Sequence, residues 1–154
     1  MKYIILSLMF VLLLISCKEK TNNQNTISVT TITDSLKCDN CGANLKKYIS
    51  TNHAVKLENG SLKHYCSINC LANDWGKINN EIKKIYVIDV QTKEFIPADK
   101  AHYVIRAPFG ITKKTTAYAY KELEYANRFK KDFNGKEITD FNKALEFIKT
   151  NKNP

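Results

Sequence analysis

The stretch of sequence that decides the fold lies at residues 54–78 and reads AVKLENGSLKHYCSINCLANDWGKI. Its first half holds two short apolar runs on either side of Asn59-Gly60, a dipeptide that accepts the positive φ angles of a two-residue hairpin turn. Apolar residues then recur at helical spacing from Ile68, and Ser67 can cap the first turn. The sequence therefore predicts a β-hairpin followed by a helix over about residues 67–80.

Further along the chain the same order of strand and helix recurs. Aligning Tyr65 with Tyr120 places a strand and then a helix in both halves, at an offset of 55 residues. Gly135 is a candidate C-terminal cap of the second of these helices, and Asp140 can cap a last helix. The other expected strands are 84–90, 101–106 and 115–120, and the other expected helices are 121–134 and the segment after residue 140. An α+β fold of two small lobes, each a sheet with a helix across it, accounts for this pattern.

The N-terminal residues predict where the protein resides. A charged start at Met1-Lys2 and an apolar run over 3–15 fit a signal peptide, since the run is too short to cross a bilayer of about 30 Å comfortably. The segment 14–17 resembles the lipobox of bacterial lipoproteins, in which the cysteine is acylated after cleavage. We expect a signal peptide at 1–16, a lipid anchor at Cys17, a flexible tether at 17–35, a cysteine-bearing lobe at 36–106 and a second lobe at 107–154. The protein would then be attached to the cell membrane or the outer membrane, facing outside the cytoplasm; an uncleaved anchor or a secreted protein is the alternative.

The composition is that of an ordinary globular domain and excludes several classes of protein. Of 154 residues, 44% are hydrophobic and 25% are charged, which excludes a disordered chain, and the length excludes a large multidomain enzyme. The net charge of +9 comes from 22 Lys and only two Arg, so nucleic-acid recognition by guanidinium groups is disfavoured. This charge indicates a solvated surface, with attraction to an acidic partner or to anionic headgroups as the alternative. No Ser/His/Asp grouping, paired catalytic carboxylates or phosphate-binding glycine loop is visible in the sequence, so no enzyme is expected.

Four cysteines form two closely spaced pairs and carry the expected chemistry. Cys38 and Cys41 form a Cys-x-x-Cys motif, and Cys66 and Cys70 lie one helical turn apart at the start of the expected helix. The intervening hairpin can fold the first pair back against the helix, so that four sulfurs converge as in a treble-clef or ribbon metal site. A helix N-terminus and nearby lysines favour the thiolate form of Cys66.

Thiolate ligands favour a soft ion, with Cu(I) as the first expectation and Zn(II) as the second. Both methionines, Met1 and Met9, lie in the expected signal peptide, so a thioether ligand is not expected in the mature protein. His64 is the expected supplementary donor, ahead of His53 and His102. Two alternatives remain open: disulfide bonds, because exported proteins meet an oxidising compartment, and a thiol redox relay.

In the order of its motifs the sequence resembles the NosL family, whose members are copper-binding accessory lipoproteins for nitrous oxide reductase. The resemblance covers about residues 38–147, and the lipobox at 14–17 is a further feature of the family. Its motifs are Cys38-x-x-Cys41-Gly42, Tyr65-Cys66-Ser67, Tyr86-Val87-Ile88-Asp89, Ile96-Pro97-Ala98, Ala101-His102-Tyr103-Val104, Pro108-Phe109-Gly110 and the strand from Ala117 to Tyr120. The resemblance implies a membrane-tethered Cu(I) chaperone with two small lobes of ββαβ type, which helps to mature the copper site of the reductase. Cys66 and Cys70 also resemble the second half of a TRASH-type heavy-metal motif.

The sequence departs from the family pattern at the positions of two methionines. Ala43 follows Cys41-Gly42 where the family usually has Met, and Phe109 stands where the family tends to have Met. The ligand carried over from the family is therefore Cys41, with Cys38 beside it, in a site richer in thiolates. Three functions remain open: a Cu(I) metallochaperone serving an extracytoplasmic acceptor, a structural zinc-binding lipoprotein that acts through protein contacts, and an extracytoplasmic thiol oxidoreductase.

Overall fold

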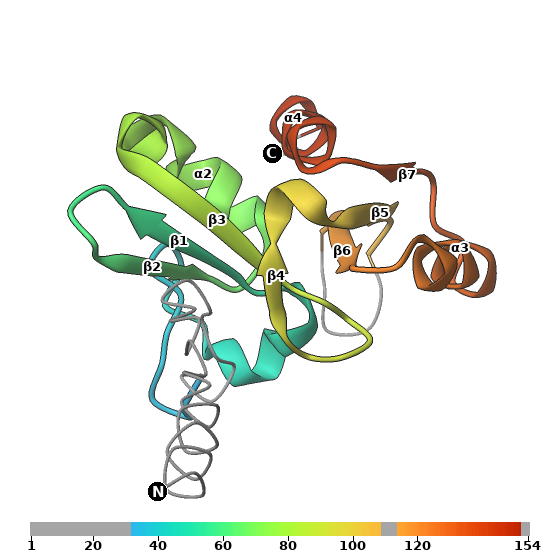
Figure 1. Cartoon of the computed structure of the whole chain (residues 1–154), viewed down its shortest axis with the longest axis horizontal. Coiled ribbons are helices and arrows are strands. Elements are labelled where there is room, and N and C mark those ends of the chain that lie inside the picture. Colours follow the sequence, from blue (N-terminus) through green and yellow to red (C-terminus); the bar gives the residue numbers. More distant parts are fainter. Residues whose placement is uncertain (1–31, 109–113, 152–154) are drawn as a thin grey trace, which may run out of the picture.

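The computed structural model describes residues 32–108 and 114–151, so the expected signal peptide, Cys17 and most of the expected tether lie outside the described residues. Within the described residues, strands form two antiparallel sheets, of order β2-β1-β3-β4 and β6-β5-β7, and helices pack on them (Figure 1). The strands are β1 (His53–Leu57), β2 (Leu62–Tyr65), β3 (Ile82–Ile88), β4 (Phe95–Pro97), β5 (His102–Arg106), β6 (Thr116–Tyr120) and β7 (Ile138–Thr139). The α-helices are α2 (Ile68–Ile78), α3 (Leu123–Asp132) and α4 (Phe141–Thr150), and the 3₁₀ helices are η3 (Leu45–Thr51), η4 (Asn79–Glu81) and η5 (Ala98–Lys100). None of the described helices is long and apolar enough to cross a bilayer.

The expected hairpin is present, with β1 and β2 paired antiparallel. Its turn has three residues rather than the expected two, because the Leu57 amide donates to the Ser61 carbonyl at 2.9 Å and the Gly60 amide donates to the Leu57 carbonyl at 2.9 Å. Gly60 has a φ of +85°, whereas Asn59 does not have a positive φ. The two-residue turn favoured by Asn-Gly needs a positive φ at both positions, so only the glycine provides the left-handed conformation that closes the loop.

Two units with the same topology make up the described part of the chain. β1, β2, α2 and β3 follow one another as β5, β6, α3 and β7 do, and their sheets have the matching orders β2-β1-β3 and β6-β5-β7. The registers match as well, because His53 faces Tyr65 in the first hairpin and His102 faces Tyr120 in the second. Each helix begins three residues after its tyrosine, which preserves the offset of 55 residues. The α+β fold of two ββαβ units is confirmed.

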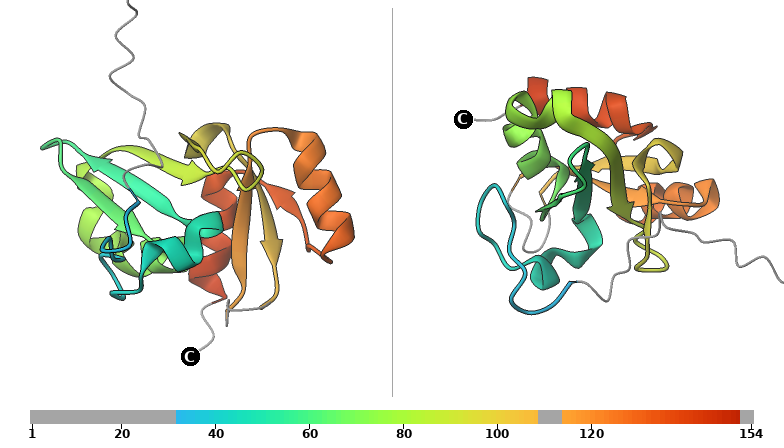
Figure 2. Two further views of the ribbon diagram at one scale, coloured as in Figure 1. Left: turned by 90° about the horizontal axis from the view of Figure 1, so that it is seen from below. Right: turned by 60° about the vertical axis from the view of Figure 1, so that its left-hand side comes forward.

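One large hydrophobic core runs through both units. α4 lies beside α2 and over β5, and its apolar face is buried in this core (Figure 2). The side chains of β5 alternate between two faces, so the second sheet also has an outer face. There α3 covers a smaller cluster formed by Val104, Tyr120 and Ala126.

The border between the two sheets lies earlier than the lobe boundary expected after residue 106. β5 pairs with β6 and with β7, so the second sheet begins at His102. Nothing local in the sequence shows which neighbour a strand pairs with, and β5 belongs to the second sheet although its residues lie in the expected cysteine-bearing lobe. A parallel bridge between Asp89 and Ala119 also connects the sheets.

The helix ends agree only partly with the sequence-based expectations. Asp140 caps α4, since its side chain accepts a backbone hydrogen bond of 2.9 Å from the first turn. Ser67 precedes α2 but makes no side-chain capping bond. After α3, Asn134 rather than Gly135 takes the left-handed conformation, with a φ of +54°. Gly135 is needed for close packing instead, because a Cβ there would lie 2.5 Å from Cγ1 of Val104.

Candidate metal centre

The first pair of cysteines sits on a tight loop that precedes the first sheet. Gly42 has a φ of +71°, a conformation that glycine adopts without steric cost. The Gly42 amide donates to the Cys38 carbonyl at 2.9 Å, and the Cys38 amide donates to the Ala43 carbonyl at 2.9 Å. These bonds close residues 38–43 into a loop that brings Cys38 and Cys41 together.

Asp39 fastens this cysteine loop to the edge strand β2. Its amide donates to the His64 carbonyl at 2.8 Å, and its carboxylate Oδ2 accepts from the His64 amide at 2.5 Å. Both outward-facing backbone groups of His64 are thereby satisfied. Because His64 lies two residues before Cys66, this contact sets the first cysteine pair against the second.

The second pair lies where β2 turns into α2. Cys66 precedes the helix and Cys70 lies in its first turn. The amides of Cys70 and Leu71 donate to the Ser67 carbonyl at 3.1 and 3.2 Å. The Thr51 hydroxyl donates to the Cys66 carbonyl at 2.6 Å in a buried hydrogen bond, which holds the corner between strand and helix.

The four thiols converge on one point, as the sequence predicts. The Sγ atoms of Cys38, Cys41, Cys66 and Cys70 all lie within 4.8 Å of one another. The Sγ–Sγ distance is 3.5 Å between Cys66 and Cys70 and 3.7 Å between Cys41 and Cys66, and all four cysteines are free. Four thiolates held tetrahedrally at about 2.3 Å from an ion such as Zn²⁺ would lie about 3.8 Å apart. The observed spacing therefore fits a shared metal ion.

The cluster is largely buried, but solvent reaches part of it. Cys38, Cys66 and Cys70 are buried, whereas Cys41 is exposed. A hollow of about 350 Å³ opens beside Cys41 and is also lined by Cys66 and Cys70. An ion held among the sulfurs can therefore be approached from this hollow, which we call the cysteine hollow.

Hydrogen bonds among the thiols favour one thiolate in the metal-free cluster. Hydrogen bonds from Cys66 and Cys70 lower the pKa of Cys38 far below its ordinary value. The hydrogen bond to Cys38 raises the pKa of Cys66 to about 12, and hydrogen bonds to Cys38 and Cys66 raise the pKa of Cys70 as well. A soft cation that binds more than one sulfur must therefore displace protons from the cluster.

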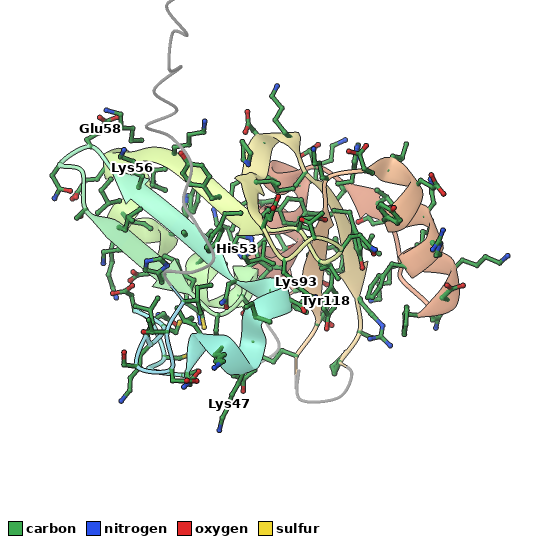
Figure 3. The ribbon with its side chains drawn as sticks, turned by 60° about the horizontal axis from the view of Figure 1, so that its bottom comes forward. Lys47, His53, Lys56, Glu58, Lys93 and Tyr118 are labelled. Atoms are coloured by element: carbon green, nitrogen blue, oxygen red, sulfur yellow. The ribbon has the colours of Figure 1, made fainter. Side chains whose placement is uncertain are left out.

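The histidines lie apart from this group. Among the described residues, the converging ligand atoms belong to the four cysteines alone, so a supplementary role of His64 stays a prediction. His64 Nδ1 is buried without a hydrogen-bond partner, and burial lowers the pKa of this side chain. His53 lies in the interior of the molecule (Figure 3), where its Nδ1 is 3.0 Å from the Thr51 carbonyl oxygen. His102 begins β5 in the second sheet.

Two residues that position the cysteines are absent from the sequence-based prediction. Asp39 lies between the two cysteines of the Cys-x-x-Cys motif, and aspartate often accepts backbone hydrogen bonds in turns. Its position in the sequence could therefore have indicated its role. Thr51 gives no such signal, because its hydroxyl bond to Cys66 joins residues 15 positions apart. The spacing of the cysteines thus predicts the ligands, whereas the residues that position them depend on the fold.

Comparisons with known proteins found a solved structure and a family model that are similar to this chain. The crystal structure of the copper chaperone NosL from Shewanella denitrificans matches with a TM-score of 0.60 and 19% sequence identity, covering 72% of this chain and 90% of that chain. At this identity the likeness concerns the fold. A comparison with curated proteins gives no match. A family model described as NosL matches residues 29–145, which is most of the sequence, and the chain therefore belongs to the NosL family.

Proposed function

We propose that this protein is a lipid-anchored Cu(I) chaperone, which takes up the ion with its four-cysteine cluster and passes it to an acceptor outside the cytoplasm. The observation that carries the proposal is the convergence of four sulfurs within 4.8 Å of one another, with Cys41 exposed. Membership in the NosL family supports copper as the ion, because the related crystal structure is described as a copper chaperone. Thiolates also favour Cu(I) over hard ions such as Mg²⁺.

The unequal burial of the sulfurs suits an ion that must be released. A closed site with four thiolates retains its metal, whereas transfer requires a position that an incoming ligand can reach. Cys38, Cys66 and Cys70 are buried, which shields an ion held among the four sulfurs. The exposed Cys41 and the cysteine hollow leave this ion accessible to the donor and the acceptor.

The proposed location and acceptor rest on the sequence. Cleavage before Cys17 and acylation of that residue would attach the protein to the cell membrane or the outer membrane, with 17–35 as a spacer. The resemblance to NosL accessory lipoproteins supports nitrous oxide reductase as the acceptor. In this role the protein is a carrier and not an enzyme, since it binds the ion and transfers it without changing it.

The copper content of reduced protein tests the ligand assignment. After anaerobic loading with Cu(I) and competition with a Cu(I) chelator, the unmodified protein should retain copper. The double variant Cys66→Ser/Cys70→Ser should lose most of it, because it removes two buried sulfurs. Ser67→Ala is the matched control: Ser67 lies between the two cysteines, and its side chain makes no capping bond. Unchanged copper stoichiometry in the double variant would refute the assignment.

A structural zinc site is the second candidate function, and the spacing of the sulfurs favours it. Distances of 3.5 and 3.7 Å between neighbouring Sγ atoms are close to those of a tetrahedral four-thiolate zinc site. The two functions differ in how readily the bound metal ion is exchanged. Zinc that stays bound against a chelator and does not give way to Cu(I) would support the structural site and contradict the chaperone.

A further inference from the structure

Resting on the proposed Cu(I) function, we propose that the cysteine hollow binds the molecule that delivers the copper. The ligand is a low-molecular-weight thiol with peptide amides and a carboxylate, presented as its anionic Cu(I) thiolate complex. The argument rests on the size of the hollow, its charge and the groups that line it.

The cysteine hollow has the size of a small-molecule site and touches the sulfurs directly. Its volume of about 350 Å³ lies at the lower end of the range for small-ligand pockets and cannot admit a folded partner. Cys41, Cys66 and Cys70 form part of its wall. A thiol held in this space can therefore keep its own sulfur on the ion while cysteine sulfurs approach the same ion.

The charge of the lining favours an anion. Among the described residues, Lys114 is the charged side chain that lines the hollow, and no carboxylate lines it. None of the ion pairs in the described part of the chain involves Lys114. Lys114 attracts a bis-thiolate complex of Cu(I) that carries carboxylates, whereas it gives no such attraction to a cationic copper species.

The remaining polar groups match the amides of a peptidic thiol. Asn69 and Asn73 lie four residues apart on α2 and so share one face of the helix, while Asn40 comes from the cysteine loop. A carboxamide both donates and accepts hydrogen bonds, which suits peptide groups and carboxylate oxygens alike. The aromatic ring of Tyr48 adds apolar surface to the same wall.

Transfer in the cysteine hollow is a ligand exchange in which copper stays Cu(I). For each bond between copper and a carrier sulfur that breaks, a bond between copper and a cysteine sulfur forms. The proton lost by the cysteine thiol passes to the departing carrier thiolate, whose ordinary pKa of about 8.5 favours the thiol at neutral pH. The exchange needs no oxidant or reductant.

The rate of copper uptake tests the charge argument. The full chain, reduced and in detergent, is mixed with Cu(I) as the anionic glutathione complex or as the cationic acetonitrile complex, and uptake is followed by the ultraviolet absorption of the copper–thiolate bonds. In Lys114→Glu, the rate of uptake from the glutathione complex should fall about tenfold at low salt. The rate of uptake from the acetonitrile complex should stay the same or rise. Lys47→Glu is the matched control. It makes the same change of charge on η3, at a side chain that points away from the molecule (Figure 3).

Saturation separates binding in the hollow from general attraction. The uptake rate should level off as the glutathione complex is raised, and Asn73→Ala should raise the half-saturation concentration about threefold without changing the equilibrium Cu(I) affinity. Equal effects of Lys114→Glu and Lys47→Glu, effects of the same sign on both complexes, or a rate that never saturates would each overturn the proposal. A protein with no Cu(I) affinity at equilibrium would instead refute the proposed function, which is a separate result.

Discussion

The two ββαβ units share a topology, yet the first carries Cys66 and Cys70 and the second carries no cysteine. At the offset of 55 residues, Cys66 corresponds to Lys121, and both stand at the corner between a strand and a helix. In the first unit Thr51 holds this corner through the Cys66 carbonyl, at 2.6 Å. In the second unit the Lys121 amide donates at 3.1 Å to the carboxylate of Asp89, a buried residue that directly follows β3. The same corner presents a metal ligand in one unit and joins the two units in the other.

The edge strands show the same contrast. The His64 carbonyl of β2 accepts from the Asp39 amide at 2.8 Å, and its counterpart in β6, the Ala119 carbonyl, accepts from the Val90 amide at 2.9 Å. One edge therefore docks the cysteine loop, and the equivalent edge docks the segment that connects β3 to β4. The metal centre of the first unit thus lies at the position where the second unit contacts the first.

The helices of the two units should contribute unequally to stability, and this is the largest effect that we expect. Leu71 of α2 is fully buried, whereas Leu123 of α3 is 49% exposed. Leu71→Ala should lower the free energy of unfolding by about 2–5 kcal/mol, because it leaves a cavity in the shared core. Leu123→Ala should lower it by less than about 1 kcal/mol. Urea unfolding of the reduced, metal-free protein measures both, and similar losses would contradict the unequal burial of the helices.

His53 should make the stability depend on pH, whereas its counterpart His102 begins a strand without being fully buried. Burial lowers the pKa of His53 to about 4, from an ordinary value of 6.5. The unfolded chain therefore takes up a proton at higher pH than the folded chain, so stability is complete above pH 6.5 and is lost as the pH falls toward 4. The loss amounts to about 3 kcal/mol.

Thermal and urea unfolding between pH 7 and pH 4 check this expectation. His53→Gln should have a flatter profile, because it removes the titrating group while keeping an amide that can reach the Thr51 carbonyl. His102→Gln is the matched control, because it makes the same exchange at a histidine that is not fully buried. Part of the slope should remain in His53→Gln, since burial also lowers the pKa of His64. A profile of His53→Gln that coincides with that of the unmodified protein would exclude this origin.

The sequence predicts those features whose cause is local. The hairpin, α2 and α3 follow from turn residues and helical spacing, and the cysteine cluster follows from the spacing of its two pairs. β4 and β7 have three and two residues, too few for any periodicity, and they exist because a neighbouring strand pairs with them. The grouping of β5 with the second sheet, the bond from Asp39 to β2 and the cysteine hollow all join residues far apart in the chain. Local pattern carries no information about such contacts.

Asp39→Ala should have the smallest effect of these changes, because it removes the carboxylate contact at the edge of β2 and leaves the contact through backbone groups. The variant keeps all four sulfurs and the amide of residue 39, and it loses the carboxylate that accepts from the His64 amide at 2.5 Å. The cysteine loop should then be held less firmly, so the affinity for Cu(I) should fall about tenfold to a hundredfold while the saturating stoichiometry stays the same.

Chelator competition measures this affinity, and Asp39→Asn should recover most of it, since the side-chain oxygen can still accept the bond. Asp34→Ala is the matched control, because Asp34 is an exposed carboxylate that pairs with Lys46 on the surface. If Asp39→Ala binds Cu(I) as tightly as Asp34→Ala does, the carboxylate adds nothing to the docking of the loop. Backbone contact alone would then hold the cysteine loop on β2, and the contrast between the units would reduce to which residues stand at the corner.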